Sequence, residues 1–370
     1  MAPIDEAHMR RALELAQRGW GTVSPNPMVG AVVLRGDDVV GEGWYHGPRG
    51  EPHAEVHALR QAGDAARGAT VVCTLEPCDH FASTPPCTRA LIDAGVARVV
   101  VAAADPNPVV DGRGVARLRE AGIEVETGLL EHDARALNVA FERHVTTGQP
   151  YVVLKMASSL DGKTAASDGT SRWITGEGAR ADVHHLRAWS DAIVVGAATA
   201  ISDDPALTVR GLDAATARQP LRVVVDSAGR VPPTLQLFDG VAPTLVATTE
   251  RAPRAQIVEW AHAGADVAVL DRDADGRVSL PSLVEDLGKR DVQGLLIEGG
   301  ATLAWSAVRE DLIDRVVLYL APLLVGGSSA PTALSGEGFA PIGEALRLGP
   351  LTVAAIDEDL KVVADVHGHR

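Results

Sequence analysis

Hydrophobic and polar positions along the first 147 residues predict alternating helices and strands. Met9, Ala12, Leu13 and Ala16 recur at the spacing of one helix face, which predicts a helix over residues 5–18. Apolar runs and period-two alternation predict strands at 29–34, 39–43, 69–75, 96–103 and 123–128. Further helices are predicted at 53–62, 87–94, 113–121 and 134–144. Helices that alternate with strands indicate an α/β unit with helices packed on a sheet.

The second part of the chain repeats this alternation after a short linker. Residues 146–150 read Thr-Thr-Gly-Gln-Pro, and an apolar strand starts at Tyr151. We therefore expect a boundary near Gly148, with domains 1–147 and 148–370. Strands are predicted at 151–157, 192–196, 221–226, 243–248, 266–270, 293–298 and 315–321, and helices at 255–264 and 280–290. Residues 351–366 predict two strands joined by a turn at 357–359.

Composition narrows the class of protein. A chain of 370 residues exceeds what one hydrophobic core usually holds, so two domains are expected. The net charge of −15 disfavours binding to nucleic acid or to an anionic membrane, and no apolar run has transmembrane length. Three cysteines argue for a reducing compartment rather than a disulfide framework. The acidic N-terminus is unlike a signal peptide, and we expect a soluble cytoplasmic protein.

Candidate metal chemistry lies between His53 and Cys87. His53, Cys78 and Cys87 are one imidazole and two thiols, the ligand set of a zinc site with an open fourth position. Each stands where a predicted helix begins or just after a strand ends, and helix N-termini favour thiolates. Glu55 is a poor co-ligand of His53, because residues i and i+2 on a helix do not share a face. It is placed to serve a zinc-activated water as proton carrier.

A structural zinc site is the main alternative, and it would use His80 as a fourth ligand. Cys73 lies in the middle of a predicted strand and is expected in the core. Zinc with a proton-carrying glutamate is the machinery of nucleobase deaminases, which usually carry a Pro-Cys-x-x-Cys motif. Here eight residues separate Cys78 from Cys87, which points to a different substrate.

The second domain carries weaker signals of its own. Gly299 and Gly300 follow an apolar strand and open a helix, a place where backbone amides can approach phosphate oxygens. The Gly-x-Gly-x-x-Gly pattern of a Rossmann domain is not present there. Lys155, Arg187 and Arg210 are candidates to bind a substrate phosphate, although a solvated surface cation is the commoner role for each.

Motifs in both halves, in the same order, resemble the bifunctional riboflavin-biosynthesis deaminase–reductase family. The stretches that carry the resemblance are Thr22–Val32, Pro52–Val56, Thr74–Cys78, Thr84–Cys87, Asp105–Pro108, Lys155, Ser159–Lys163, Trp173–Thr175, Asp203–Arg210 and Ile297–Gly300. The resemblance implies an α/β protein with an N-terminal cytidine-deaminase-like three-layer domain and a C-terminal dihydrofolate-reductase-like domain. The first would deaminate 2,5-diamino-6-(5-phosphoribosylamino)pyrimidin-4-one with Zn²⁺, and the second would use NADPH to reduce the ribosyl group to ribityl.

The resemblance also implies roles for individual residues. His53, Cys78 and Cys87 match zinc ligands, and Glu55 matches the proton carrier. The deaminase substrate would contact Asn26, His46, Asp105 and Asn107. The reductase substrate would contact Lys155, Ser171, Arg187, Leu207, Arg210 and Glu298. The cofactor would contact Ala157, Trp173, Thr199, Asp203, Ser227, Gly300, Ala301, Thr302, Leu303, Ala304, Trp305 and Ser306. Trp173 could equally be a core residue. Lys155 and Asp203 are alternative aids to hydride transfer, between which the sequence does not choose.

One stretch departs from the family pattern. Between the two cysteines the family usually has Ser-His-x-Gly followed by a basic residue, whereas this chain has Asp79 to Ser83. Ser83 therefore replaces the basic residue, and Asp79 adds a negative charge. We expect weaker substrate binding at the deaminase site, with Arg49 or Arg89 as candidates to compensate.

Two other functions remain open. One is a nucleoside or tRNA deaminase fused to a reductase of folate-like substrates, which the wide cysteine spacing and the net charge disfavour. The other is a zinc-stabilised binding protein without catalysis, which predicts four protein ligands and no dependence on Glu55. The expected partners are small phosphorylated pyrimidines, and the sequence is compatible with a monomer or a homo-oligomer.

Overall fold

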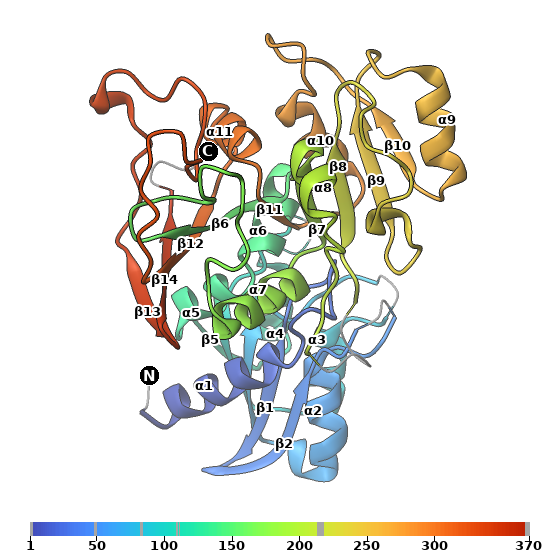
Figure 1. Cartoon of the computed structure of the whole chain (residues 1–370). Coiled ribbons are helices and arrows are strands. Elements are labelled where there is room, and N and C mark those ends of the chain that lie inside the picture. The colour runs from blue at the N-terminus through green and yellow to red at the C-terminus, as the bar shows by residue number, and fades with distance from the viewer. Residues whose placement is uncertain are drawn as a thin grey trace. The chain divides into compact units, whose positions relative to one another are not determined.

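The computed structural model describes residues 3–47, 50–81, 84–108, 110, 112–212 and 218–366 (Figure 1). The chain divides into two compact units, residues 1–148 and 149–370. Among the described residues, no helix combines the length and the apolar character needed to cross a bilayer.

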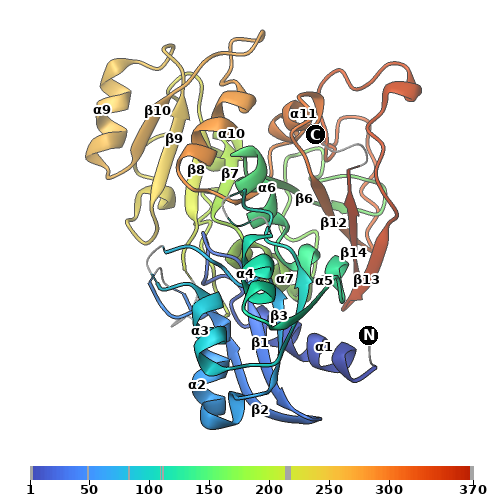
Figure 2. The same cartoon turned by 180° about the vertical axis from the view of Figure 1, so that it is seen from behind.

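Unit 1 is a five-stranded sheet between two layers of helices (Figure 2). The strand order is β2-β1-β3-β4-β5, and β3, β4 and β5 run parallel while β1 is antiparallel to β2 and β3. The strands are β1 (Gly30–Arg35), β2 (Asp38–Trp44), β3 (Thr70–Leu75), β4 (Arg98–Ala103) and β5 (Glu124–Thr127). The helices are α1 (Pro3–Gln17), α2 (Ala54–Ala62), η1 (Gly63–Ala66), α3 (Cys87–Ala94), α4 (Arg113–Glu120), α5 (Glu131–Leu137) and α6 (Val139–Thr147).

Alternation along the strands divides the core of unit 1 into two layers. Val33, Cys73 and Val101 pack with α2, α3 and α4 on one face of the sheet. Val32 and Val100, one residue away on their strands, pack with α1 and α5 on the other face. Successive side chains of a strand point to opposite faces, so strands covered on both sides are apolar throughout. Cys73 is fully buried, as the sequence predicts.

Two glycines let β2 pack directly against the backbone of α2. A Cβ on Gly43 would lie 2.3 Å from the carbonyl oxygen of Ala54, and one on Gly41 would lie 2.2 Å from that of Ala58. Neither distance is physically accessible to a side chain, so the helix sits this close only because both positions lack one. This contact fixes the register between the end of β2 and the start of α2.

The helix predicted at residues 134–144 is wrong as a single element. The chain forms α5 and α6, with Asn138 in a non-helical conformation between them. The side chain of Asn138 accepts a hydrogen bond from the Met28 amide at 2.8 Å and donates one to the Met28 carbonyl at 2.9 Å. Met28 is 110 residues away, and this tertiary contact overrides the helical pattern.

Unit 2 contains a nine-stranded sheet in the order β10-β9-β8-β7-β11-β6-β12-β14-β13. The strands from β10 to β12 in this order are parallel, and β14 and β13 complete the sheet in antiparallel fashion. The strands are β6 (Tyr151–Ser159), β7 (Ala192–Gly196), β8 (Leu221–Val225), β9 (Thr244–Thr248), β10 (Asp266–Val269), β11 (Gly294–Glu298), β12 (Arg315–Ala321), β13 (Thr352–Ile356) and β14 (Asp359–Asp365). The helices are α7 (Glu177–Trp189), α8 (Ala197–Asp203), η2 (Gln236–Phe238), α9 (Arg254–His262), α10 (Leu280–Lys289), α11 (Ala301–Arg309) and η3 (Ile342–Glu344).

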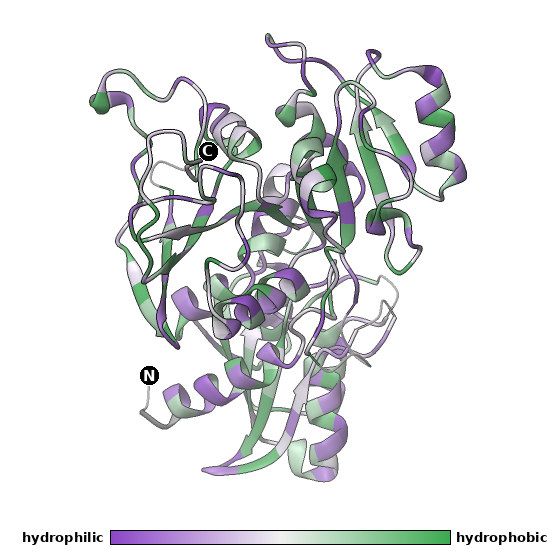
Figure 3. Ribbon diagram, in the orientation of Figure 1, coloured by the Kyte–Doolittle hydropathy of each residue, from purple (hydrophilic) through white to green (hydrophobic). Residues whose placement is uncertain are grey.

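Hydrophobic residues concentrate along the central strands of unit 2 (Figure 3). Strands β7 and β11 are almost continuously buried, as expected for parallel strands covered on both faces. In parallel α/β sheets, ligands bind beyond the carboxyl ends of the strands. Here that edge presents Gly196, Ser227 and Glu298, each at or just after the last residue of its strand.

The glycine packing between β2 and α2 yields a stability prediction. Gly43→Ala should destabilise unit 1 by about 1–3 kcal/mol, because the new methyl group forces the helix away from the strand. Gly343→Ala is the matched control, since a Cβ there meets no atom within 4 Å. The thermal midpoint and the zinc retained by each variant measure the effect. Equal midpoints for the two variants would contradict the packing argument.

Candidate active sites

Three separate elements carry the predicted metal ligands of unit 1. His53 is the residue immediately before α2, Cys78 follows β3 by three residues, and Cys87 is the first residue of α3. The backbone amide of Cys87 donates a hydrogen bond to the Cys78 sulfur at 3.5 Å. This hydrogen bond joins the two ends of the loop between β3 and α3, since Cys78 lies near its start and Cys87 at its end.

The ligand atoms of these residues converge on one point. They lie within 4.8 Å of one another, with His53 Nδ1 at 3.2 Å from Cys87 Sγ and at 3.6 Å from Cys78 Sγ. One imidazole nitrogen and two sulfurs are donors that suit Zn²⁺. Among the described residues, His80 does not belong to this group, so the geometry favours three protein ligands and an open position.

The protonation of the two thiols also fits a divalent cation. A hydrogen bond from the Cys87 thiol, assisted by His53, lowers the pKa of Cys78 to about 4. The neighbouring Cys78 sulfur and burial raise the pKa of Cys87. The opposite shifts of the two thiols have one cause, because two adjacent thiolates repel each other. A cation between them removes that repulsion and favours loss of the second proton.

Glu55 lies beside this cluster and is almost fully buried. Its side chain is 3% exposed, and burial raises the pKa of its carboxyl group. The neighbouring His53 charge and the Cys87 thiol oppose this rise in pKa, which places Glu55 next to the ligands. A buried carboxyl group beside the ligands is placed to carry a proton between a bound water molecule and a substrate.

The other residues predicted for this pocket fall into two groups. Asn26 donates to the Tyr45 hydroxyl at 3.2 Å, and the Tyr45 ring meets the His53 ring edge-on with centroids 5.7 Å apart. On the other side, Asp105 accepts a hydrogen bond from the Asn107 amide at 2.9 Å. Burial, with smaller contributions from nearby Glu76 and Cys78, raises the pKa of Asp105 to about 6.

Sequence reasoning missed Glu76, which orders the Asp105 loop. This buried carboxylate accepts hydrogen bonds from the backbone amides of Asp105, Gly112 and Val115 at 3.3, 3.1 and 3.0 Å. Glu76 thereby connects the loop after β4 to the end of β3, just before Cys78. Its presence in the Thr74–Cys78 motif was the available signal.

A groove of about 470 Å³ adjoins His53 on the side of Nε2. Its lining combines apolar residues with two arginines: Pro52, His53, Val56, Arg60, Phe81, Thr84, Pro85, Pro86, Arg89, Ala90 and Asp93. Arg89 is exposed and 3.6 Å from Asp93. The hydroxyl of Thr88 donates to Asp79, which ties that departure from the family pattern to α3. Arg49 and Ser83 lie outside the described residues.

In unit 2, Gly299 and Gly300 form the turn between β11 and α11, where the sequence predicts a phosphate site. Both glycines have positive φ, 80° and 85°, and no side chain caps the first turn of α11. A Cβ on Gly300 would press to 3.2 Å from Thr199 Oγ1, so Thr199 of α8 borders the same turn. Open amides at a helix start beside a hydroxyl suit the phosphates of a dinucleotide.

A buried ion pair lies at the end of β11 next to this turn. Arg187 of α7 donates from Nε and Nη2 to the two carboxylate oxygens of Glu298 at 2.6 and 2.9 Å. Glu298 pairs in register with Lys155 across β11 and β6. Burial lowers the pKa of Lys155, and the charge of Glu298 opposes this shift. Arg187 is therefore engaged with Glu298, which makes it a poorer phosphate ligand than its charge alone suggests.

Five further predicted residues of unit 2 lie on α8, on β6 and on loops. Leu207 is buried with a positive φ of 49°, and the Arg210 amide donates to His184 Nδ1 at 3.1 Å. The Asp203 carbonyl accepts a hydrogen bond from the Arg172 guanidinium at 2.8 Å. Ala157 lies on β6, and Ser171 is exposed on the loop that precedes α7. None of these contacts joins two of the five predicted residues to each other.

The alternative that Trp173 is a core residue is wrong. Its side chain is 69% exposed and lies under the guanidinium of Arg180 at 4.6 Å from the ring centroid. Ser227, by contrast, is held inside the loop after β8, where its hydroxyl accepts from the Val278 amide at 2.9 Å.

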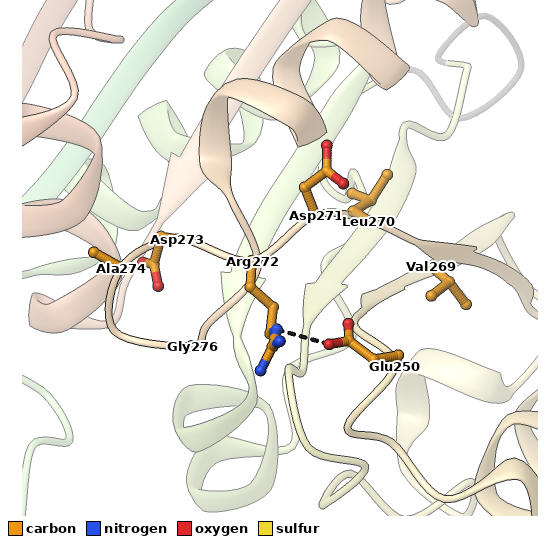
Figure 4. A pocket seen from close by; sticks show the side chains of 8 residues that line it. All are labelled: Glu250, Val269, Leu270, Asp271, Arg272, Asp273, Ala274 and Gly276. Carbon is orange, nitrogen blue, oxygen red and sulfur yellow. Dashed lines mark ion pairs between the residues drawn. The ribbon is translucent and has the colours of Figure 1, made fainter.

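A second cavity of about 820 Å³ lies beyond the carboxyl ends of β9 and β10 (Figure 4). It is lined by Glu250, Val269, Leu270, Asp271, Arg272, Asp273, Ala274 and Gly276. Arg272 is paired with Glu250 at 2.7 Å. None of the predicted cofactor residues lines it, and three carboxylates against one guanidinium disfavour a phosphate ligand there.

Known protein families match both units of the chain. The family described as RibD C-terminal domain matches residues 150–362, and the one described as cytidine and deoxycytidylate deaminase zinc-binding region matches residues 3–103. The chain is 42% identical over 362 residues to riboflavin biosynthesis protein RibD of Bacillus amyloliquefaciens, covering 98% of this chain and 96% of that one. It is 46% identical over 335 residues to RibD of Escherichia coli K12, covering 88% and 89%.

Solved structures also resemble this chain over nearly its whole length. Acinetobacter baumannii RibD superposes with a TM-score of 0.89 at 42% identity, covering 99% of both chains. The Thermotoga maritima diaminohydroxyphosphoribosylaminopyrimidine deaminase/5-amino-6-(5-phosphoribosylamino)uracil reductase superposes with a TM-score of 0.85 at 34% identity, covering 98% of this chain and 99% of that one.

The buried ion pair of unit 2 makes a stability prediction. Arg187→Ala should reduce the free energy of unfolding of unit 2 by about 3–5 kcal/mol, because Glu298 would stay buried without its partner. Arg290→Ala, which breaks the more exposed pair with Asp286, should cost less than about 1 kcal/mol. Urea unfolding of both variants measures the difference. Similar losses of unfolding free energy for the two variants would show that the Arg187–Glu298 pair stabilises unit 2 no more than a surface ion pair does.

Proposed function

The chain belongs to the family of the riboflavin biosynthesis protein RibD, and on that premise we propose how its residues divide two consecutive reactions. The protein is a bifunctional enzyme of riboflavin biosynthesis, a deaminase and a reductase, with zinc and NADPH as cofactors. Its fold pairs a cytidine-deaminase-like domain with a dihydrofolate-reductase-like domain. We assign the deaminase to residues 1–147 and the reductase to residues 148–370.

In the first reaction, the substrate is 2,5-diamino-6-(5-phosphoribosylamino)pyrimidin-4-one. We assign His53, Cys78 and Cys87 as the zinc ligands on the strength of their converging atoms. When bound, zinc supplies a water molecule activated for attack on the ring carbon. Glu55 would take up a proton from water and return it to the departing amino group, so that ammonia leaves. The observation that carries this assignment is the buried Glu55 carboxyl group beside the three ligands.

Asn26, His46, Asp105 and Asn107 are proposed to hold the pyrimidine. Two observations support the proposal. Asn26 is linked through Tyr45 to the His53 ring, and Asp105 and Asn107 lie on the loop that Glu76 ties to the Cys78 side of the site.

In the second reaction, NADPH supplies the hydride that reduces the ribosyl group of the deaminated product. We propose Lys155, Ser171, Arg187, Leu207, Arg210 and Glu298 as substrate contacts. The proposed cofactor contacts are Ala157, Trp173, Thr199, Asp203, Ser227 and residues 300–306. The positive-φ glycine turn beside Thr199 supports the cofactor assignment.

Lys155 is the better of the two candidates to assist hydride transfer. It lies half-buried beside Glu298, whereas the carboxylate of Asp203 accepts a hydrogen bond from the Ser202 hydroxyl at 2.8 Å. Full reductase turnover by a Lys155→Ala variant would exclude the lysine.

We further propose that the protein acts in the cytoplasm on small phosphorylated pyrimidines, without nucleic acid and as either a monomer or a homo-oligomer. Three unpaired thiols and the net charge of −15 support a reducing compartment and small-molecule substrates.

Glu55→Gln tests the deaminase mechanism. Ammonia release should fall about 10²- to 10⁴-fold, because the amide neither takes up nor releases a proton as the carboxyl group does. Zinc content should stay at the wild-type value, since Glu55 is not a ligand. Glu120→Gln, on the exposed face of α4, is the matched control and should deaminate normally. Full activity of Glu55→Gln would refute the mechanism and favour a zinc-stabilised binding protein.

The Ser83 departure yields a prediction about substrate affinity. Ser83→Arg should lower the deaminase KM about tenfold by restoring a cation for the substrate phosphate. Arg89→Ala or Arg49→Ala should raise KM in the wild-type background, whereas Arg117→Ala on α4 should not. Steady-state ammonia release measures all four variants. An unchanged KM in the first three would show that no compensation for Ser83 is needed.

A further inference from the structure

His46, which is exposed two residues after the end of β2, contacts two other rings. Its ring centroid lies 4.3 Å from that of Trp44 and 4.3 Å from that of His57. The rings of His46 and His57 are stacked, with 16° between their planes, while Trp44 is tilted by 41°. The Arg18 guanidinium covers the Trp44 ring at 4.7 Å. We refer to the rings of Trp44, His46 and His57, together with the Arg18 guanidinium, as the ring stack.

The packing of β2 on α2 sets the alignment of the ring stack. Gly41 and Gly43 bring the strand onto the helix backbone, and two consecutive residues after the strand then meet two successive turns of the helix. Tyr45 meets His53, and His46 meets His57. His57 stands one turn after His53, and its amide donates to the His53 carbonyl at 3.1 Å. The helix that supplies a proposed zinc ligand therefore also supplies the support for His46.

His57 contributes the face of its ring to this contact rather than a chain of hydrogen bonds. Its Nε2 atom is buried and has no hydrogen-bond partner among the described residues. The other ring nitrogen is oriented by the Pro52 carbonyl. Stacked aromatic rings at this separation attract each other beyond their simple burial.

We propose that His57 is a positioning residue of the deaminase, which holds the His46 ring in one orientation for the pyrimidine substrate. An exposed imidazole that turned freely would lose rotamer freedom when the substrate binds, and that loss weakens binding. Because the ring stack already holds the His46 ring in one orientation, this loss of rotamer freedom does not occur when the substrate binds. The inference rests on the proposed function, because it takes His46 to contact the substrate.

The test compares four variants of the full-length, zinc-loaded protein: His57→Ala, His57→Phe, His46→Ala and the double variant His46→Ala/His57→Ala. Deaminase KM and kcat are measured from ammonia release, together with zinc content and the reductase rate. His57→Phe keeps the ring face and removes only the bond to the Pro52 carbonyl. His262→Ala on α9, in unit 2, is the control for loss of a histidine.

His57→Ala is expected to raise KM about 3- to 10-fold with kcat within about twofold, zinc content and reductase rate unchanged. His57→Phe should stay within about twofold of the wild-type KM. In the double variant, loss of His57 should add nothing to the effect of His46→Ala, because the two side chains act as one unit.

Three results would overturn the inference while leaving the proposed function intact. These are a wild-type KM for His57→Ala, additive effects in the double variant, and loss of zinc from His57→Ala, which would make the role structural. A wild-type KM for His46→Ala has a different meaning. It would reject the proposed contact between His46 and the substrate, and the inference would fall with it.

Discussion

The structure of the first unit depends on bringing two sulfurs and one imidazole nitrogen to a single point from three different elements. None of the three ligands lies inside a helix or a strand by more than its first residue: His53 precedes α2, Cys78 follows β3, and Cys87 begins α3. The site therefore exists only when both helices are packed on the sheet. The charge of two neighbouring sulfurs opposes that arrangement until a cation compensates it, so metal binding and folding of this region stabilise each other.

The second unit meets a similar requirement by a different means. Glu298 is a buried carboxylate at the end of a central parallel strand, and it is tolerated there because Arg187 binds both of its oxygens. Lys155, on the adjacent strand, adds a second positive charge to the same region. Each site thus concentrates charge in a buried place; side chains balance it in unit 2, and a metal ion would balance it in unit 1.

The sequence pattern was sufficient for most of the strands and for the metal cluster. Apolar runs such as Ala192–Gly196 are long enough to be unambiguous, and the imidazole and two thiols leave few alternatives to zinc. The pattern failed where a contact distant in sequence decides the outcome. Asn138 breaks a helix because it binds the backbone of Met28, and Trp173 lies at the surface with the Arg180 guanidinium over its ring. Glu76 and His57 were likewise missed as supports, since their roles depend on which loops and rings the fold brings beside them.

The central claim is that this one chain performs two consecutive steps on one pyrimidine phosphate. Incubation of the purified, zinc-loaded protein with 2,5-diamino-6-(5-phosphoribosylamino)pyrimidin-4-one, with and without NADPH, tests it most directly. Without NADPH, the account predicts stoichiometric ammonia and accumulation of the deaminated ribosyl compound. With NADPH, it predicts the same ammonia, oxidation of the cofactor and conversion of that compound to its ribityl form. Oxidation of NADPH without ammonia release, or ammonia release that is never followed by reduction, would contradict it.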